Sequence, residues 1–165
     1  MKKVHVWVGQ SRIAGKGLYA GQEIATGTTI LRYRGTKISK AQSARALAKG
    51  NAYICYFNDR YDLDGKALNN TARYINHSCD PNCTLQRTSR ALWVVALRDI
   101  REGEELTHRY DYAYDPAGYR DFPCFCGAPN CVGYIVDHEY WALITQQSYA
   151  SAGALGDSYA SVFWG

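Results

Sequence analysis

The stretch "RYINHSCDPNC", residues 73–83, decides how this chain is interpreted. Its eleven positions hold one Arg, one His, two Asn, two Cys and one Pro. Strands and helices need periodic apolar faces, and this stretch offers only Tyr74 and Ile75. The pattern therefore indicates a functional site rather than a piece of scaffold.

The composition around this stretch is that of a folded protein. A chain of 165 residues is long enough for one domain with its own core. A hydrophobic fraction of 47% and an aromatic fraction of 13% exclude a disordered or low-complexity protein. Fourteen Tyr against four Phe suit a polar cavity with aromatic walls as well as a core. A net charge of +4 without a dense Lys/Arg run neither indicates nor excludes nucleic-acid binding.

The first residues, "MKKVHVWVGQ", contain an apolar run too short for the core of a signal peptide. No stretch approaches the length of a membrane span. We expect a soluble protein in a reducing compartment, either the nucleus or the cytoplasm, or a host cell if the source is microbial. In such a compartment six Cys predict metal ligands or catalysis before disulfides.

Short strands and few helices are expected, which gives a mainly β, β-rich α+β fold. Ser39 followed by Gln42 is a capping-box pattern, and Gly50 is a typical stop, so a helix is predicted over 41–49. Apolar alternation or short apolar runs predict strands at 4–8, 29–33, 52–57, 92–97 and 106–112. In the last strand, alternation predicts His108, Tyr110 and Tyr112 on one face and Arg109 and Asp111 on the other.

The segment "NDRYDLDG", residues 58–65, has two interpretations. It ends in Asp64-Gly65, a turn signal, and we expect a hairpin turn there. Its acidic residues also suggest a calcium loop, but Arg60 would then occupy the first ligand position, which disfavours that alternative.

The segment "CFCGAPNC" places three thiols, Cys124, Cys126 and Cys131, on a short loop. Three thiolates this close can share one tetrahedral zinc, which needs a fourth ligand from elsewhere. Cys79 and Cys83 are the candidate donors. The alternative is that these residues are ordinary reduced or disulfide-paired cysteines.

Three separated motifs then occur in order: AGKGLYA at 14–20, ARYINHSCDPNC at 72–83 and GEELTHRYDY at 103–112. Together with the cysteine loop, they make the chain similar to the SET-domain protein lysine methyltransferases with a post-SET zinc motif. The likeness runs from about residue 3 to residue 135.

The resemblance implies a SET fold of several small sheets, in which the NHSC segment and the tyrosine strand thread together as a pseudoknot. It divides the chain into a SET domain at 1–115, a post-SET zinc-binding segment at 116–140 and a tail at 141–165, which we expect to be partly mobile. The expected ligands of a structural Zn²⁺ are Cys79, Cys124, Cys126 and Cys131.

The resemblance also implies S-adenosylmethionine as methyl donor and a peptidyl lysine as acceptor, which enter from opposite faces and meet in a channel. The acceptor would be a histone tail or a similar basic protein, with no membrane partner and only indirect contact with nucleic acid. Tyr110 is the expected catalytic residue. The expected cofactor contacts are Lys16, Gly17, Tyr53, Arg73, Asn76, His77 and Tyr110, and the expected lysine channel is Tyr56, His108 and Tyr112.

The chain departs from the family pattern at several positions. His108 stands where the family has Phe or Tyr, a site that helps to set how many methyl groups are added, so the number of methyl groups is left open. Arg109 stands where the family has Asp. The aromatic residue that would close over the substrate is either Tyr134 or Trp141, and whether Tyr53 or Tyr56 faces the channel is also open.

Two other functions remain as alternatives. In the first, a catalytically weak SET module binds a protein tail without methyl transfer, an idea that His108 and Arg109 motivate. In the second, the chain is a small zinc-dependent nucleic-acid binder, an idea that rests only on mild basicity and scattered Tyr.

Overall fold

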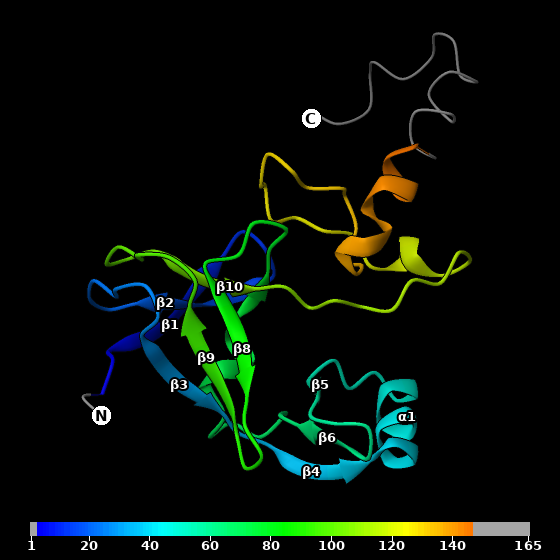
Figure 1. The fold of residues 1–165 in the computed structure, drawn as a ribbon, viewed down its shortest axis with the longest axis horizontal. Coiled ribbons are helices and arrows are strands. Elements are labelled where there is room, and N and C mark those ends of the chain that lie inside the picture. The colour runs from blue at the N-terminus through cyan, green and yellow to red at the C-terminus, as the bar shows by residue number, and fades with distance from the viewer. Residues whose placement is uncertain (1–2, 147–165) are drawn as a thin grey trace, which may run out of the picture.

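Three small sheets make up most of the regular secondary structure in a computed structural model that describes residues 3–146. Their strand orders are β1-β2-β10-β7, β3-β9-β8 and β4-β6-β5 (Figure 1). The strands are β1 (Val6–Ser11), β2 (Gly15–Ala20), β3 (Thr29–Tyr33), β4 (Thr36–Ser39), β5 (Ile54–Tyr56), β6 (Tyr61–Asp64), β7 (Asn76–His77), β8 (Cys83–Arg87), β9 (Leu92–Ala96) and β10 (Glu105–His108). The expected β-rich fold with few short helices is confirmed.

The predicted helix is present as α1 (Lys40–Ala48). The Ser39 side chain accepts from the Gln42 amide, and the Gln42 side chain accepts from the Ser39 amide, so the capping box is complete. Gly50 follows with a φ of 79°, the left-handed conformation that commonly ends a helix. Three short 3₁₀ segments are also present, namely η1 (Thr71–Tyr74), η2 (Tyr119–Asp121) and η3 (His138–Tyr140).

The parallel pairing of β7 with β10 brings two motifs together that are far apart in the sequence. Asn76 lies opposite Thr107, and His77 lies opposite His108. Strand β10 also pairs with β2 in antiparallel orientation, so it runs between the glycine motif and the NHSC segment. This arrangement positions the candidate site.

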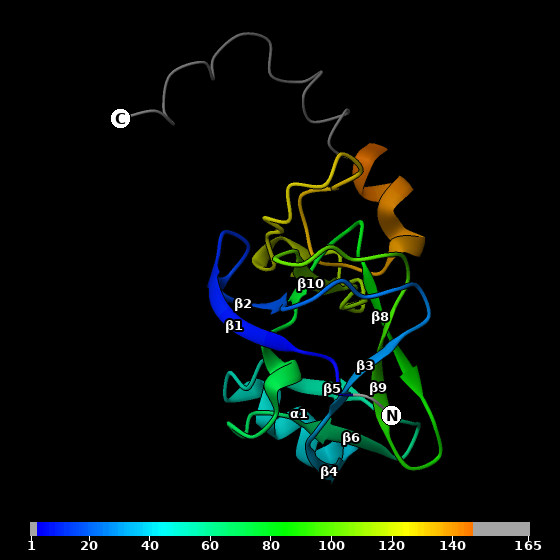
Figure 2. The ribbon, with the colours of Figure 1, turned by 90° about the vertical axis from the view of Figure 1, so that its left-hand side faces the viewer.

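The core lies between the first two sheets. Its buried side chains include Leu18, Ile75, Leu92, Val94 and Leu106, each at most 2% exposed. A second, smaller cluster packs Tyr119, Val136 and Ile144 together. Figures 1 and 2 show this C-terminal segment at one end of the molecule and β4, β5, β6 and α1 at the other.

Several predicted boundaries were wrong. Strand β1 extends to Ser11 instead of ending at residue 8, because pairing with β2 continues through the glycines, where side-chain alternation gives no signal. Residues 61–64 form strand β6 rather than the predicted hairpin turn. The turn lies just before this strand, where the Asn58 side chain accepts hydrogen bonds from the backbone amides of Arg60 and Tyr61. The calcium-loop alternative is therefore excluded. Strand β10 ends at His108, short of the predicted residue 112.

The sequence predicts that the C-terminal tail begins at residue 141. Residues 141–146 are helical, and Ile144 is buried in the second cluster. The remainder of the expected tail, residues 147–165, lies outside the described residues. Between residues 3 and 146, no helix has both the length and the apolar character needed to cross a bilayer.

Candidate active site and metal centre

A cavity of about 1050 Å³ opens between the three sheets and the segment that follows β10. This volume suits a ligand of nucleotide size. Eight of the predicted site residues line it: Lys16, Tyr53, Tyr56, Arg73, Asn76, His108, Tyr110 and Tyr112. Gly17 and His77 are not among the lining residues.

Both the side-chain hydroxyl and the backbone N–H of Tyr110 make hydrogen bonds. Its hydroxyl donates to the carbonyl of Ile75 at 3.0 Å, and its backbone N–H donates to Nδ1 of His77 at 3.1 Å. Its ring lies 5.0 Å from the His108 ring and 5.7 Å from the Tyr112 ring, measured between centroids. Burial raises the pKa of the Tyr110 phenol, so the hydroxyl stays protonated near neutral pH.

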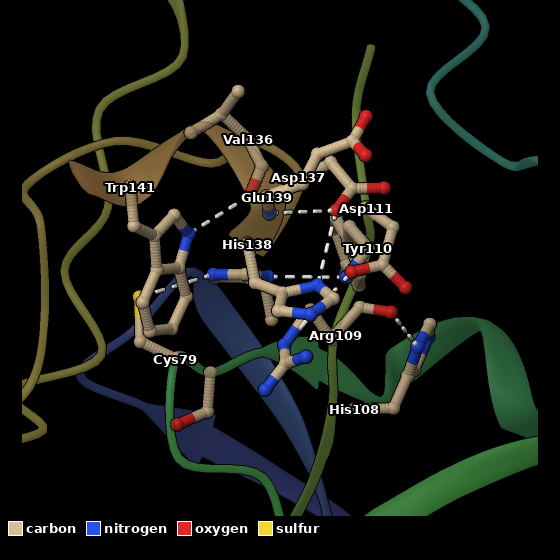
Figure 3. Close-up of polar contacts among 12 residues, drawn as sticks. Cys79, His108, Arg109, Tyr110, Asp111, Val136, Asp137, His138, Glu139 and Trp141 are labelled. Carbon is tan, nitrogen blue, oxygen red and sulfur yellow. Dashed lines mark hydrogen bonds and ion pairs between the residues drawn. The ribbon is translucent and has the colours of Figure 1, made fainter. Parts of the chain in front are cut away.

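His108 presents a neutral imidazole to the cavity. Its Nδ1 lies 2.8 Å from the carbonyl oxygen of Arg109, and a carbonyl can only accept, so Nδ1 carries the proton (Figure 3). Burial lowers the pKa of His108 to about 4, which keeps the ring uncharged at neutral pH. Nε2 is therefore left as an acceptor.

The predicted face assignment of the segment after β10 was wrong in part. His108, Tyr110 and Tyr112 do lie together, but Arg109 and Asp111 line the same cavity instead of facing away. The reason is that the chain leaves the extended conformation, and Asp111 has a φ of 48°. Strict alternation ends with the strand.

Asn76 belongs to a polar network centred on Glu105. The Asn76 amide donates to Glu105 Oε1 at 2.7 Å and to the Lys16 carbonyl at 2.9 Å. Glu105 also accepts from the Ser11 hydroxyl at 2.8 Å and from the Tyr19 hydroxyl at 3.2 Å. Sequence reasoning missed Glu105 and Ser11, which lie 94 positions apart and show no local pattern that joins them.

Gly17 makes room for this network. A Cβ atom at position 17 would lie 2.7 Å from Cδ of Glu105 and 3.0 Å from Cβ of Ser11. A side chain here would therefore displace Glu105 from its partners. The expectation that glycine at this position lets the backbone approach a cofactor stays a prediction.

The two tyrosines that the sequence left undecided have different surroundings. The Arg73 guanidinium lies 4.0 Å from the centre of the Tyr53 ring, and Arg73 also donates to the Lys66 carbonyl. Tyr56 is 48% exposed at the rim, where the cations of Lys40 and Arg87 lie 4.3 and 4.6 Å from its ring centre. Both line the cavity, so the choice between them for the channel stays open.

Four cysteines converge next to this cavity. The sulfur atoms of Cys79, Cys124, Cys126 and Cys131 all lie within 4.8 Å of one another, with 3.9 Å between Cys79 and Cys124. A tetrahedral zinc with bonds of about 2.3 Å separates its sulfurs by about 3.8 Å, so the donor set fits zinc. Cys83, the other candidate, is buried on β8 in the main core and is not part of the group.

Ionisation differs within the cluster, because burial raises the pKa of the Cys79 and Cys124 thiols. Burial opposes ionisation of Cys126, yet hydrogen bonds from the amides of Cys79 and Ala128 and from neighbouring thiols lower the pKa of Cys126 to about 7. The Cys79 amide lies 3.4 Å from the Cys126 sulfur. Thiolates are the form of cysteine that binds metal.

Neither aromatic candidate for closing the site lines the cavity. Trp141 donates from Nε1 to the Val136 carbonyl at 3.2 Å, and the Arg109 guanidinium lies 5.3 Å from the Trp141 ring (Figure 3). Tyr134 packs edge-on against Tyr119 in the second cluster. Arg109 thus connects the cavity wall to the C-terminal segment.

The sequence of this chain is similar to those of known proteins. The family model described as "SET domain" matches residues 15–111. The "Histone-lysine N-methyltransferase, H3 lysine-4 specific" of Saccharomyces cerevisiae is 35% identical over 144 residues, which cover 81% of this chain and 13% of that protein. The "Histone-lysine N-methyltransferase 2D" of Homo sapiens is 32% identical over 139 residues, covering 78% of this chain and 2% of that protein.

A third relative, the "Histone-lysine N-methyltransferase trr" of Drosophila melanogaster, is 34% identical over 137 residues, covering 77% of this chain and 6% of that protein. The chain thus spans only a small part of the length of these curated relatives. The family model covers the NHSC motif and all but the outermost residue of the glycine and tyrosine motifs, and the cysteine loop lies beyond its last matched residue. On this evidence, the chain belongs to the SET-domain family.

Proposed function

We propose that this protein transfers a methyl group from S-adenosylmethionine to the side-chain nitrogen of a lysine in a protein. The observation that carries the proposal is the hydroxyl of Tyr110, which donates to the Ile75 carbonyl in a large cavity that Asn76 and His108 also line. The names of the relatives support it, since each is a histone-lysine N-methyltransferase.

The polar residues that line the cavity suit the methyl donor. S-adenosylmethionine supplies a methyl group on a sulfonium sulfur, which leaves as a neutral thioether. Lys16, Arg73 and Asn76 would hold the amino-acid and nucleoside parts, because all three line the cavity and carry polar groups. Glu105 orients the Asn76 amide for that task.

The aromatic residues that line the cavity suit a lysine side chain. The acceptor nitrogen must be uncharged before it attacks, and an apolar channel beside a sulfonium lowers the pKa of a lysine from about 10.4. The rings of His108, Tyr110 and Tyr112 would line such a channel, and the neutral His108 adds no positive charge of its own. After the transfer, the nitrogen releases its proton to water.

The residues contribute mainly by holding the two reactants in line. A well-aligned pair of reacting atoms can lower the barrier by roughly 7 to 11 kcal/mol relative to free encounter in solution. The Ile75 carbonyl and the Tyr110 hydroxyl would offer oxygen atoms to the methyl group, where weak C–H···O contacts add a smaller effect.

The substrate class proposed is a histone tail or a similar basic protein in a reducing compartment such as the nucleus or cytoplasm. Cys79, Cys124, Cys126 and Cys131 would hold a structural Zn²⁺. We propose the division into a SET domain at 1–115 and a post-SET segment at 116–140 on the same basis, since three of the four cysteines belong to the second part.

The alternative is a module that binds a protein tail without transferring a methyl group. This alternative is motivated by Arg109, which stands where the family has Asp. Its guanidinium lies next to the Trp141 ring. A module of this kind would bind lysine peptides without any dependence on the methyl donor.

The test is an incubation of the purified chain with methyl-labelled S-adenosylmethionine and arrays of lysine peptides. Tyr110→Phe removes the hydroxyl, and we expect the labelling rate to fall at least about tenfold, the equivalent of one hydrogen bond. Tyr114→Phe is the matched control, because Tyr114 stacks on Tyr140 away from the cavity. Peptide binding without labelling by the unaltered chain would favour the binding module.

A further inference from the structure

His77 lies between the cysteine cluster and Tyr110. Its side chain is buried, with 2% of the residue exposed. Its Nδ1 is 3.1 Å from the backbone nitrogen of Tyr110, and its Nε2 is 3.6 Å from the sulfur of Cys79. Cys79 in turn lies 3.9 Å from the sulfur of Cys124. One imidazole therefore contacts a candidate metal ligand and the candidate catalytic residue.

The direction of these two hydrogen bonds follows from their donors. A backbone N–H can only donate, so Nδ1 of His77 is an acceptor and carries no proton. The proton of the neutral ring is therefore on Nε2, which donates to the sulfur of Cys79. The sulfur accepts this bond best as a thiolate, the form that a metal-bound cysteine has.

The backbone at Tyr110 depends on this imidazole. Strand β10 ends at His108, so the Tyr110 amide lies beyond the ladder that joins β10 to β7. Among the described residues, the one hydrogen bond found for the Tyr110 N–H is to His77. Asp111, the next residue, already has a φ of 48°. The imidazole thus replaces a sheet partner at the point where the chain turns.

We propose that His77 is a positioning residue that couples the metal centre to Tyr110: the thiolate of Cys79 fixes the imidazole tautomer, and the imidazole fixes the Tyr110 backbone. The catalytic meaning of this coupling rests on the proposed function. The coupling itself concerns only hydrogen bonds within the chain. The metal then contributes to the shape of the active site as well as to the fold of the cysteine loop.

Two substitutions separate the two hydrogen bonds. His77→Asn places an acceptor oxygen near the position of Nδ1, so it keeps a partner for the Tyr110 amide and loses the donor to Cys79. His77→Gln places an N–H near the position of Nε2, so it keeps the donor to Cys79 and loses the acceptor. The two variants are matched in polarity, and both lack a ring.

The experiment uses ¹⁵N-labelled full-length chain loaded with zinc, and NMR of the imidazole nitrogens and backbone amides. We expect the proton of His77 on Nε2 and a protected Tyr110 amide. In zinc-loaded His77→Gln, the Tyr110 amide should exchange about tenfold faster, the effect of one lost hydrogen bond, while His77→Asn should keep most of the protection. The Thr107 amide, held by the Asn82 side chain at 2.8 Å, is the internal control and should not change.

Removal of zinc with a chelator provides the second arm. We expect the unaltered chain to lose protection at Tyr110, with Thr107 unchanged. A His77 proton on Nδ1 in the loaded protein, equal protection of Tyr110 in the Gln and Asn variants, or equal loss at Tyr110 and Thr107 on chelation would each overturn the proposal.

These readouts do not need methyl transfer, so they separate two kinds of failure. If the NMR results are as expected but no labelled methyl group reaches any lysine peptide, the proposed function fails and the coupling stands. If the chain transfers methyl groups and the rate in zinc-loaded His77→Gln equals that of the unaltered chain, the positioning role is wrong and the proposed function stands.

Discussion

Glu105→Gln is the substitution that tests the polar network most sharply, because it removes one charge and one acceptor with almost no change of shape. Glu105 accepts from the Asn76 amide at 2.7 Å and from the Ser11 hydroxyl at 2.8 and 3.0 Å. A glutamine offers one oxygen, so its own amide group and that of Asn76 would compete for too few acceptors. A hydrogen bond to a charged group contributes about 1.5 to 3 kcal/mol.

A loss of about 2 kcal/mol in the orientation of Asn76 corresponds to about 30-fold weaker binding of S-adenosylmethionine. Isothermal titration calorimetry measures this directly, with urea unfolding as a check that the variant remains folded. Glu102→Gln removes the same charge from an exposed residue in the turn before β10 and should leave binding unchanged. Binding by Glu105→Gln within twofold of the unaltered chain would refute the orienting role.

The remaining predictions concern three other parts of the molecule. Gly17→Ala should weaken S-adenosylmethionine binding at least about tenfold in calorimetry, since its Cβ displaces Glu105; unaltered binding would contradict this. Because the pKa of His108 is lowered from 6.5 to about 4, the unfolded chain binds more protons between these pH values and stability falls as the pH drops. From pH 7 to pH 5 the free energy of unfolding, measured with urea, should fall by about 2 kcal/mol more in the unaltered chain than in His108→Phe. Equal decreases in the two proteins would contradict the lowered pKa of His108. Metal analysis should find reduced zinc in Cys126→Ser and full zinc in Cys83→Ser; the reverse result would reassign the cluster.

Local chemistry in the sequence predicted part of the fold well. The Ser39 and Gln42 capping box and the apolar run of β9 are governed by neighbouring residues, so both were found near their true bounds. The hairpin turn was misplaced because Asp64 is the last residue of β6, and the turn that joins β5 to β6 lies at 57–60. The signal marks a change of direction, and only tertiary pairing decides what lies on each side.

The candidate site shows the same division. Motif order located the lining residues Asn76, His108 and Tyr110, and the cysteine spacing located three of the four clustered thiols. Glu105 and Arg109, and His77 through its contact with Tyr110, have partners in chain segments far away in the sequence. Those contacts depend on where β10 ends and on the conformation of Asp111, which no periodicity encodes.

The central claim is that donor and acceptor meet in one cavity beside Tyr110. A bisubstrate compound that joins an adenosyl group to a lysine amine by a short linker tests it most directly. If both halves bind at once, its affinity should exceed that of either half by a factor on the order of 10² or more, and Tyr110→Phe should reduce the gain. A compound that binds no more tightly than its adenosyl half would contradict the account.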